Sequence, residues 1–421
     1  MKRRDFLAAS ALLALLAPSS VLAANKKKTT AHAAAKPASK TRATKRGRSS
    51  AKPVVEQHAR STRSAPSTSS TPAAAATSVP AEAEQRDAIS LPDEPLTPWR
   101  IYDITSSITL NKVSGKARLW LPLALHKDTP WQRSLGHGWQ GNFASAGLYR
   151  DPAAEMVVFY ADWNEGVTPQ LQITSQVAKR DRHFDITKRG SAAERSDVLR
   201  RCLHSSNLVP TDGLVRRTAE HAIGRIKDPV AQGKAIYDWV IDNTLYDPSR
   251  PGIGSGDVEA MLDSGHLSGK SADISLLFVG LCRSIGIPAR PVFGQRIDSS
   301  RLFSGLGATG NLSTDQQCRA EFYTPGYGWI PVNPADVRKA IDEEHLSSSD
   351  PKLVVLKKLL FGFWEMNWVA FNSAQDVKLR GSNGRALPFL VLPEAETPAG
   401  RFDSLDSSLL SYTVNASRVE G

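Results

Sequence analysis

The chain has 421 residues, 41% of them apolar, which is enough for two or three domains with real cores and excludes full disorder. Its net charge of +11 lies at one end. Residues 1–64 hold fifteen Lys or Arg against Asp5 and Glu56, so the remaining 357 residues carry a net charge of −2. A folded part this close to neutral argues against nucleic-acid binding through a broad basic face.

Residues 1–24 have the features of an export signal. A basic start is followed by an Ala/Leu run and by Val21-Leu22-Ala23, a small-residue cleavage pattern. Arg3-Arg4 resembles a twin-arginine signal, and an ordinary secretory signal with a basic start is the alternative. We therefore expect an exported protein of the periplasm or cell envelope. No run of 18 apolar residues exists, which argues against an integral membrane protein.

Residues 25–97 are predicted to form a disordered basic linker. The segment is almost entirely Ala, Lys, Arg, Ser, Thr and Pro, and positions 25–90 hold no aromatic residue, so it cannot bury enough surface to fold. It is either a solvated spacer or a tether to anionic envelope polymers or lipid headgroups, because dense cationic charge on a flexible chain favours polyanions.

Residues 98–190 are predicted to form a β-rich accessory domain, built as a sandwich. Several runs alternate apolar and polar residues, and Ser114-Gly115 is typical of a hairpin turn between two of them. The apolar positions of the runs are Ala117, Leu119, Leu121 and Leu123, then Met156, Val158 and Tyr160, then Leu171, Ile173 and Val177. Three cysteines are too few for a disulfide framework in an exported chain.

The pattern then changes to helical spacing. Two helices are expected over 214–226 and 229–240, and a third follows Gly269. Ser271 stands at the start of this third helix, whose apolar stripe runs through Ile274, Leu277, Phe278, Leu281 and Ile285.

Residues 318–333 are predicted to form two short antiparallel strands around a Pro325-Gly326 turn. Counting outward from that turn places Tyr323 near Gly328, and Gln317 near Asn333. The expected arrangement is a helix packed on an antiparallel sheet.

These segments together resemble a bacterial transglutaminase-like protein of the papain-like superfamily. The likeness is strong over 195–345. It is carried by Tyr237-Asp238-Trp239-Val240, Gly254 to Leu262, Gly269-Lys270-Ser271-Ala272-Asp273, Leu277-Phe278-Val279-Gly280-Leu281, Gly286-Ile287-Pro288-Ala289-Arg290, Cys318-Arg319-Ala320-Glu321-Phe322-Tyr323 and Gly328-Trp329. The resemblance implies an α+β fold, in which a transglutaminase-like domain follows the β-sandwich-like domain. Residues 346–421, a helix and added strands, are expected to pack on it.

The family's catalytic triad is substituted at all three positions. The resemblance implies a Cys nucleophile at the helix start, a His base on the adjoining strand and an Asp that orients the His. Here those positions hold Ser271, Gln317 and Asn333. An amide has no basic nitrogen near neutral pH, so Gln317 cannot accept a proton from Ser271. Three neutral replacements indicate natural divergence away from catalysis.

Few other residues could supply the missing chemistry. His266 precedes Ser271 by five positions and is more typical of a surface loop. Cys318 should face away from the cleft because it alternates with Gln317 along the strand. Cys282 is expected to be a core residue. The carboxylates expected to have structural capping or turn roles are Asp273 and Asp336.

No metal or cofactor site is predicted. No pair of His or Cys has ligand-like spacing, and the glycines at 305, 307 and 310 are not followed by the Lys-Ser of a phosphate loop. Trp329, Trp364 and Trp368 are expected to build a core, and the last two share one face if the segment is helical.

The sequence thus predicts an exported transglutaminase-like protein that binds peptide-like or protein ligands without catalysis. The alternative is an acyl-transferase or amide hydrolase that uses Ser271 with an unidentified base. The first requires only a retained cleft, whereas the second requires a titrating group near Ser271.

Overall fold

The computed structural model describes residues 97–190 and 193–420. The predicted signal segment, residues 1–24, lies outside this range, and so does the predicted linker, residues 25–97, except for Thr97. Among the described residues, no helix combines the length and apolar character needed to cross a bilayer.

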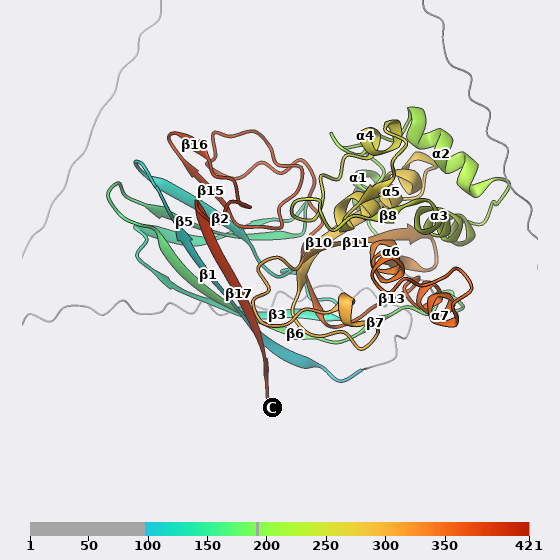
Figure 1. Ribbon diagram of the computed structural model, residues 1–421, viewed down its shortest axis with the longest axis horizontal. Coiled ribbons are helices and arrows are strands. Elements are labelled where there is room, and N and C mark those ends of the chain that lie inside the picture. The colour runs from blue at the N-terminus through green and yellow to red at the C-terminus, as the bar shows by residue number, and fades with distance from the viewer. Residues whose placement is uncertain (1–96, 191–192, 421) are drawn as a thin grey trace, which may run out of the picture. The chain divides into compact units, whose positions relative to one another are not determined.

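The β-rich part consists of two antiparallel sheets (Figure 1). In spatial order the first sheet is β17 (Leu410–Val419), β1 (Arg100–Leu110), β6 (Gln170–Lys179) and β3 (Gln132–Gly141). The second is β16 (Gly400–Arg401), β15 (Glu394–Thr397), β2 (Ala117–Pro122), β5 (Met156–Trp163) and β4 (Ser145–Asp151). Apolar residues from both sheets share one core, including Ile108, Leu119, Phe159 and Ile173. The predicted sandwich is therefore present.

The predicted hairpin at Ser114-Gly115 is wrong. β1 pairs with β17 and β6, whereas β2 pairs with β15 and β5, so this turn carries the chain from one sheet to the other. A turn signal between two strand patterns fixes a reversal of direction but not which strands bond to each other.

The C-terminal residues 346–421 divide between the two parts of the fold. α7 (Pro351–Leu359) and β14 (Trp368–Asn372) pack with the helical part, as expected. β15 and β17 instead bond to β2 and β1, and β17 does so over ten residue pairs. The last strand thereby covers an edge of β1 whose N–H and C=O groups would otherwise lack partners.

The helical part contains a third antiparallel sheet. That sheet has the order β12 (Gly328–Val332), β11 (Gln316–Thr324), β10 (Ala289–Arg296) and β14. The remaining helices are α1 (Ser196–Arg201), α2 (Gly213–Ile223), α3 (Pro229–Asn243), α4 (Val258–Asp263), α5 (Ser271–Ser284) and α6 (Pro334–Glu343), with a 3-10 turn at Ser304–Leu306. Two further strand pairs are β7 (Arg182–His183) with β13 (Phe363–Trp364), and β8 (Leu245–Tyr246) with β9 (Ser268–Gly269).

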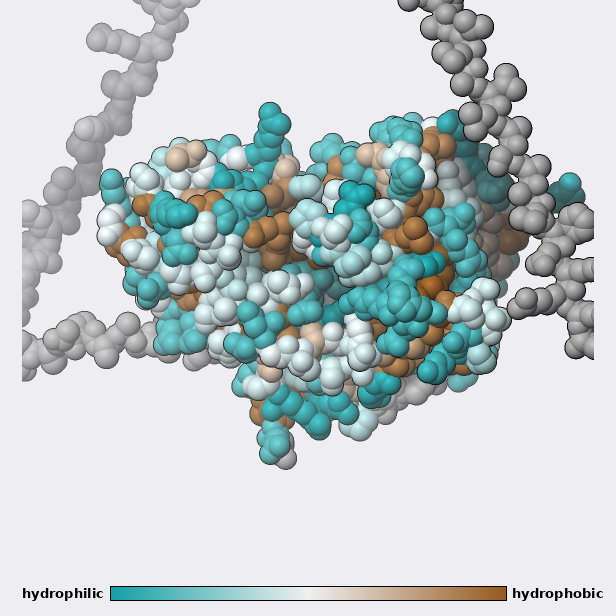
Figure 2. All heavy atoms as spheres, in the orientation of Figure 1, coloured by the Kyte–Doolittle hydropathy of each residue, from teal (hydrophilic) through white to brown (hydrophobic). Residues whose placement is uncertain are grey.

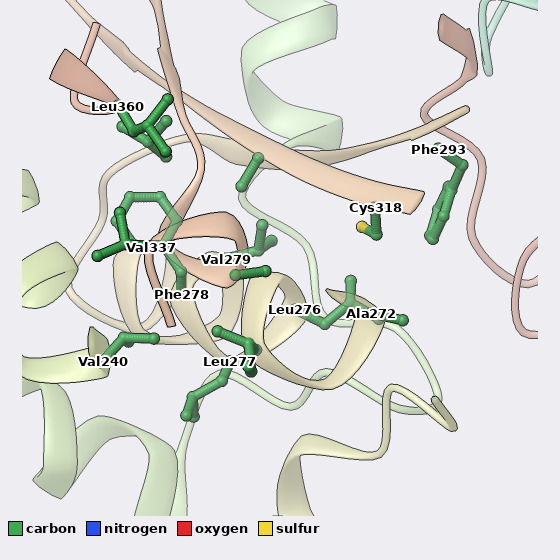
Figure 3. Close-up of a cluster of buried hydrophobic side chains, with 14 of the residues drawn as sticks. Val240, Ala272, Leu276, Leu277, Phe278, Val279, Phe293, Cys318, Val337 and Leu360 are labelled. Carbon is green, nitrogen blue, oxygen red and sulfur yellow. The ribbon is translucent and has the colours of Figure 1, made fainter. Parts of the chain in front are cut away.

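α5 is the central helix, and every one of its residues is buried. Its predicted apolar stripe lies in the main core, and Figure 3 shows Ala272, Leu276 and Cys318 from β11 close together. Burial on all sides explains why α5 holds no exposed polar face, unlike an ordinary surface helix. The helix is therefore firmly held beside the sheet, with its N-terminal residue at the candidate site.

Two tryptophans expected on one helical face lie in strands instead. Trp364 is in β13 and Trp368 is in β14, and their ring centroids are 5.4 Å apart. Trp131 from the β-rich part packs edge-on against Trp364 at 5.4 Å. Their role as core residues is confirmed, while the helical assignment fails because the i, i+4 spacing of two apolar residues also fits two strands joined by a turn.

Buried ion pairs join the two parts of the fold. Glu321 on β11 accepts from Arg182 of β7 at 2.5 Å and from Arg290 of β10 at 2.5 Å. Arg290 also donates to Glu155 at 3.1 Å. Such pairs are costly to break, because each leaves an uncompensated charge in the interior.

Candidate functional site

Ser271 is the first residue of α5, as predicted. The helix begins there because Asp273, in the first turn, accepts a hydrogen bond from the Lys270 backbone N–H at 2.9 Å. The same carboxylate accepts from the Gly256 N–H at 2.8 Å. The predicted capping role of Asp273 is confirmed.

The glycine-rich segment that precedes α5 packs closely around the Asp273 carboxylate. A Cβ on Gly254 would lie 1.9 Å from one Asp273 carboxylate oxygen, and a Cβ on Gly269 would lie 2.4 Å from it. Gly254 also has a φ of +100°, which L-residues with side chains rarely adopt. Only glycine therefore allows the backbone to approach the carboxylate that starts α5.

The Ser271 hydroxyl has one hydrogen-bond partner among the described residues. Its Oγ accepts from the Cys318 backbone N–H at 3.1 Å. One turn later the Ser275 Oγ donates to the Cys318 carbonyl at 2.9 Å, so the two serines fasten α5 to β11 on either side of one residue. In the described part of the chain, no side chain is placed to take a proton from Ser271.

The hairpin β11–β12 is one residue out of the predicted register. Tyr323 pairs with Trp329, not with Gly328, and Thr324 pairs with Gly328. The turn therefore holds three residues, 325–327, and the Tyr327 N–H donates to the Thr324 carbonyl at 3.1 Å. Counting from a Pro-Gly pair assumes a two-residue turn, and the longer turn shifts every partner by one position.

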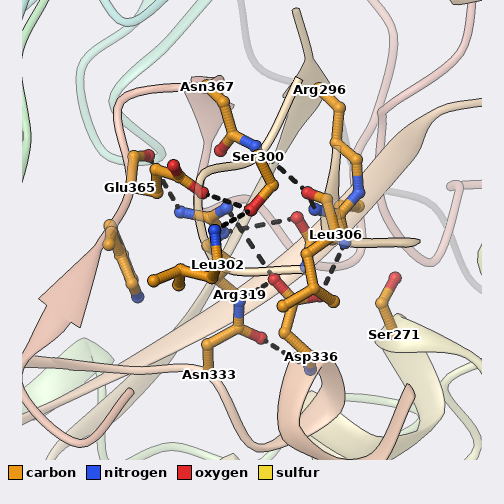
Figure 4. A network of polar contacts seen from close by, with 12 residues as sticks. Ser271, Arg296, Ser300, Leu302, Leu306, Arg319, Asn333, Asp336, Glu365 and Asn367 are labelled. Atoms are coloured by element: carbon orange, nitrogen blue, oxygen red, sulfur yellow. Dashed lines mark hydrogen bonds and ion pairs between the residues drawn. The ribbon is translucent and has the colours of Figure 1, made fainter. Parts of the chain in front are cut away.

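Gln317 and Asn333 meet through a third residue, Asp336 in the first turn of α6. Figure 4 shows Asn333 beside Asp336. Gln317 Nε2 donates to Asp336 Oδ1 at 2.5 Å, and Asn333 Nδ2 donates to Oδ2 at 2.6 Å. Asn333 also caps α6, since its Oδ1 accepts from the Asp336 N–H at 3.1 Å. Neither amide bonds to Ser271.

Asp336 is the residue whose importance sequence reasoning missed. It was expected to have only a turn or capping role, yet its carboxylate accepts from both amides and from Arg296 Nη2 at 2.6 Å. Arg319 Nη2 lies 3.9 Å from Oδ2. The available signal was the spacing of three residues between Asn333 and Asp336, which predicts that the two contact each other in a helix's first turn.

The positive charges around Asp336 keep its carboxyl group ionised. Burial alone raises the pKa of this carboxyl, but the positive charges of Arg296 and Arg319 outweigh burial and hold the pKa below its ordinary value. Burial lowers the pKa of Arg319 to about 9, although Asp336 opposes the shift. Gln317 and Asn333, at the positions predicted for the base and the orienting residue, thus both donate to a buried salt bridge.

A cavity of about 60 Å³ opens beside Ser271. Its polar lining includes Ser271, Gln317, Lys270, Lys339, Arg296 and Asp336. Burial, and next the charge of Lys339, lower the pKa of Lys270. The cavity therefore brings two of the three triad positions together with several charged groups.

The other candidate residues lie away from this chemistry. His266 is exposed in the loop before β9, as predicted, and Cys318 and Cys282 are fully buried in the core. Burial raises the pKa of both thiols, which makes them poor nucleophiles. Within the described residues, no three side chains of His, Cys, Asp or Glu gather in a way that could hold a metal ion.

Comparison with known proteins assigns this arrangement to a family. The model of the transglutaminase-like superfamily matches residues 216–334, a range that spans Ser271, Gln317 and Asn333. An uncharacterised protein of Haemophilus influenzae is 31% identical over 303 residues, covering 67% of this chain and 82% of the relative.

Two solved structures are similar at lower levels. A candidate cysteine protease from Cytophaga hutchinsonii has 17% identity and a TM-score of 0.45, covering 77% of this chain and 89% of its own. The periplasmic domain of TgpA from Pseudomonas aeruginosa has 15% identity and a TM-score of 0.31, covering 55% of this chain and 91% of its own. On the strength of the superfamily match and the Haemophilus relative, the chain belongs to the transglutaminase-like superfamily.

Proposed function

We propose that this protein is an exported, non-catalytic member of its family that binds a peptide-like or protein ligand at the cavity beside Ser271. The observation that carries the proposal is the bonding of Gln317. Its amide donates to Asp336, and among the residues that the structure describes no base forms a hydrogen bond to the Ser271 hydroxyl. A serine without a base is a poor nucleophile, and loss of triad members removes several orders of magnitude of rate.

Asp336 cannot readily replace the missing histidine. Its carboxylate oxygens already accept from Gln317, Asn333 and Arg296. Its pKa is also held below the ordinary value by Arg296 and Arg319, which makes the carboxylate a weak base at neutral pH.

Lys270, which precedes Ser271 in sequence, is another charged group in the lining of the cavity. Its Nζ donates to the Gly252 carbonyl at 3.1 Å, and it makes no hydrogen bond to Ser271. The alternative function, acyl transfer or amide hydrolysis by Ser271, would require this amine or another group to rotate toward the hydroxyl.

Export and envelope partners complete the proposal. They rest on the signal-like sequence of residues 1–24 and the cationic composition of residues 25–97, which would favour anionic envelope polymers. The face drawn in Figure 2 is mostly polar, with apolar residues in small separate patches, as expected of a surface that contacts water.

The test compares acyl-transfer and hydrolysis rates of three proteins on peptide amide and ester substrates. They are the mature protein, Ser271→Ala, and the triple variant Ser271→Cys, Gln317→His, Asn333→Asp. We expect the native protein and Ser271→Ala to show equal rates, neither above the uncatalysed background. Native activity that disappears in Ser271→Ala would refute the proposal and favour the alternative enzyme.

The triple variant asks whether the cavity still supports chemistry. Asn333→Asp places a carboxylate against Asp336 Oδ2, which Asn333 now contacts at 2.6 Å, so folding of this variant is verified by urea unfolding. Activity gained by a folded triple variant would show that only the chemical groups were lost. A folded but silent variant would indicate that the Arg296–Asp336 pair also blocks the geometry.

A further inference from the structure

The cavity beside Ser271 carries an excess of positive charge. Its lining holds three cationic side chains, those of Lys270, Arg296 and Lys339, and two carboxylates, those of Asp315 and Asp336. Counted at neutral pH, the lining has one more positive than negative charge. A small cavity with an unbalanced charge attracts an ion of the opposite sign.

The excess can be assigned to the two lysines. Arg296 and Asp336 neutralise each other across 2.6 Å, and Lys339 has a loose pair with Glu343 at 3.7 Å on the outside of α6. Among the described residues, no carboxylate oxygen comes within 4 Å of Lys270 Nζ, whose one hydrogen bond is to the Gly252 carbonyl. Lys270 is therefore a half-buried ammonium without an ion pair, although the charges of Asp247 and Asp273 partly oppose the lowering of its pKa.

The two ammonium groups influence each other across the cavity. Burial, followed by the charge of Lys339, lowers the pKa of Lys270. A negative group between them would remove this repulsion and replace the water that burial excludes. The start of the fourteen-residue helix α5 at Ser271 adds a further favourable dipole.

We propose that this cavity holds a single carboxylate of a peptide-like ligand, anchored by Lys270 and Lys339. The proposal rests on the non-catalytic ligand-binding function above and names the chemical group that the ligand must carry. The volume of about 60 Å³ suits it, because about 10–15 Å³ is enough for one water molecule and the cavity therefore has room for a larger group such as a carboxylate.

A monoanion fits better than a phosphate dianion. The surplus of the lining is one positive charge, and Asp315 and Asp336 would repel the second negative charge of a phosphate. A neutral amide of the same shape would gain none of the ionic attraction and would leave Lys270 unpaired.

The experiment measures binding of small probes to the mature protein by ligand-observed NMR at constant ionic strength. The small probes are acetate, acetamide and inorganic phosphate. The two peptide probes are N-acetyl-Ala-Ala with a free C-terminal carboxylate and the same peptide with a C-terminal amide. We expect acetate to bind and acetamide not to bind. We expect N-acetyl-Ala-Ala to bind more tightly than acetate, and its amide to lose at least tenfold in affinity. That result would identify a peptide as the source of the carboxylate.

Three variants locate the site. Lys270→Gln and Lys339→Gln should each weaken acetate binding at least tenfold, while Lys227→Gln, at an exposed lysine before α3, should leave it unchanged. Equal binding of acetate and acetamide by the native protein would overturn the proposal without any variant. Tighter binding of phosphate, lost in the same lysine variants, would replace the carboxylate by a phosphate group.

Failure of this proposal is distinguishable from failure of the proposed function. Probe binding is measured without turnover and repeated in Ser271→Ala, where an acyl-transfer reaction cannot occur. Absent carboxylate binding with a silent enzyme assay would overturn only the ligand assignment. Turnover by the native protein would overturn only the non-catalytic function.

Discussion

Asp336→Asn tests whether the Arg296–Asp336 pair at the candidate site is a structural salt bridge. The substitution keeps the shape of the side chain and removes its charge. It leaves the guanidinium groups of Arg296 and Arg319 in the interior, where their side chains are only 6% and 2% exposed. Breaking a buried ion pair by removing one partner costs about 3–5 kcal/mol.

A loss of this size is a large share of total stability, since domains are commonly stable by about 5–15 kcal/mol. The introduced amide also presents N–H groups toward Gln317, whose own Nε2 now donates to Asp336. We therefore expect the urea midpoint, followed by tryptophan fluorescence, to fall by the equivalent of about 3–5 kcal/mol with an unchanged slope.

The matched control lies on the same helix. Glu343→Gln removes a loose pair with Lys339 in which the Glu343 side chain is 40% exposed, and it should cost no more than about 1 kcal/mol. If Asp336→Asn were as mild as Glu343→Gln, the two arginines would not depend on Asp336, and the structural interpretation would be refuted. Arg296→Met added to Asp336→Asn should recover part of the loss, because it removes one of the stranded charges.

Two pH effects follow from buried titrating groups in the β-rich part. Burial, and then the nearby His126, lower the pKa of His137 to about 4, whereas the pKa in the unfolded chain is about 6.5. The fold therefore favours the neutral imidazole, and the stability that His137 contributes above pH 6.5 is lost as the pH falls toward 4. Relative to His137→Gln, the native protein should lose up to about 3 kcal/mol between pH 7 and pH 4 in urea unfolding, and a pH-independent difference would contradict this. Burial raises the pKa of Glu394 to about 7 despite Arg401, so its protonated form stabilises the fold at low pH and this stability is lost as the pH rises from about 4.5 through 7. Glu394→Gln should therefore gain stability relative to the native protein between pH 5 and pH 8, and a constant offset across that range would count against the raised pKa.

The sequence by itself determined the parts whose cause is local. The apolar stripe from Ile274 to Ile285 is a property of consecutive residues, and it appears as α5 with Ser271 at its first position. Alternation along the strand places Cys318 in the core and Gln317 at the cavity. The absence of a basic group at position 317 could also be read directly, because it depends on residue type alone.

Tertiary structure decided which partners these residues take. The three-residue turn before Gly328 shifted the hairpin register, and β17 bonds to β1 across 300 or more positions of sequence. Neither choice is encoded in a local period, since a strand pattern is compatible with many partners and registers.

The charge balance of the cavity was the feature least predictable from the sequence. Lys270 lies beside Ser271 in sequence, but Arg296, Lys339 and Asp336 come from a strand and a helix that follow it. Their pairing exists only after these elements pack, and so does the ammonium of Lys270 that is left without an ion pair, because electrostatic balance depends on distances across the fold rather than along the chain.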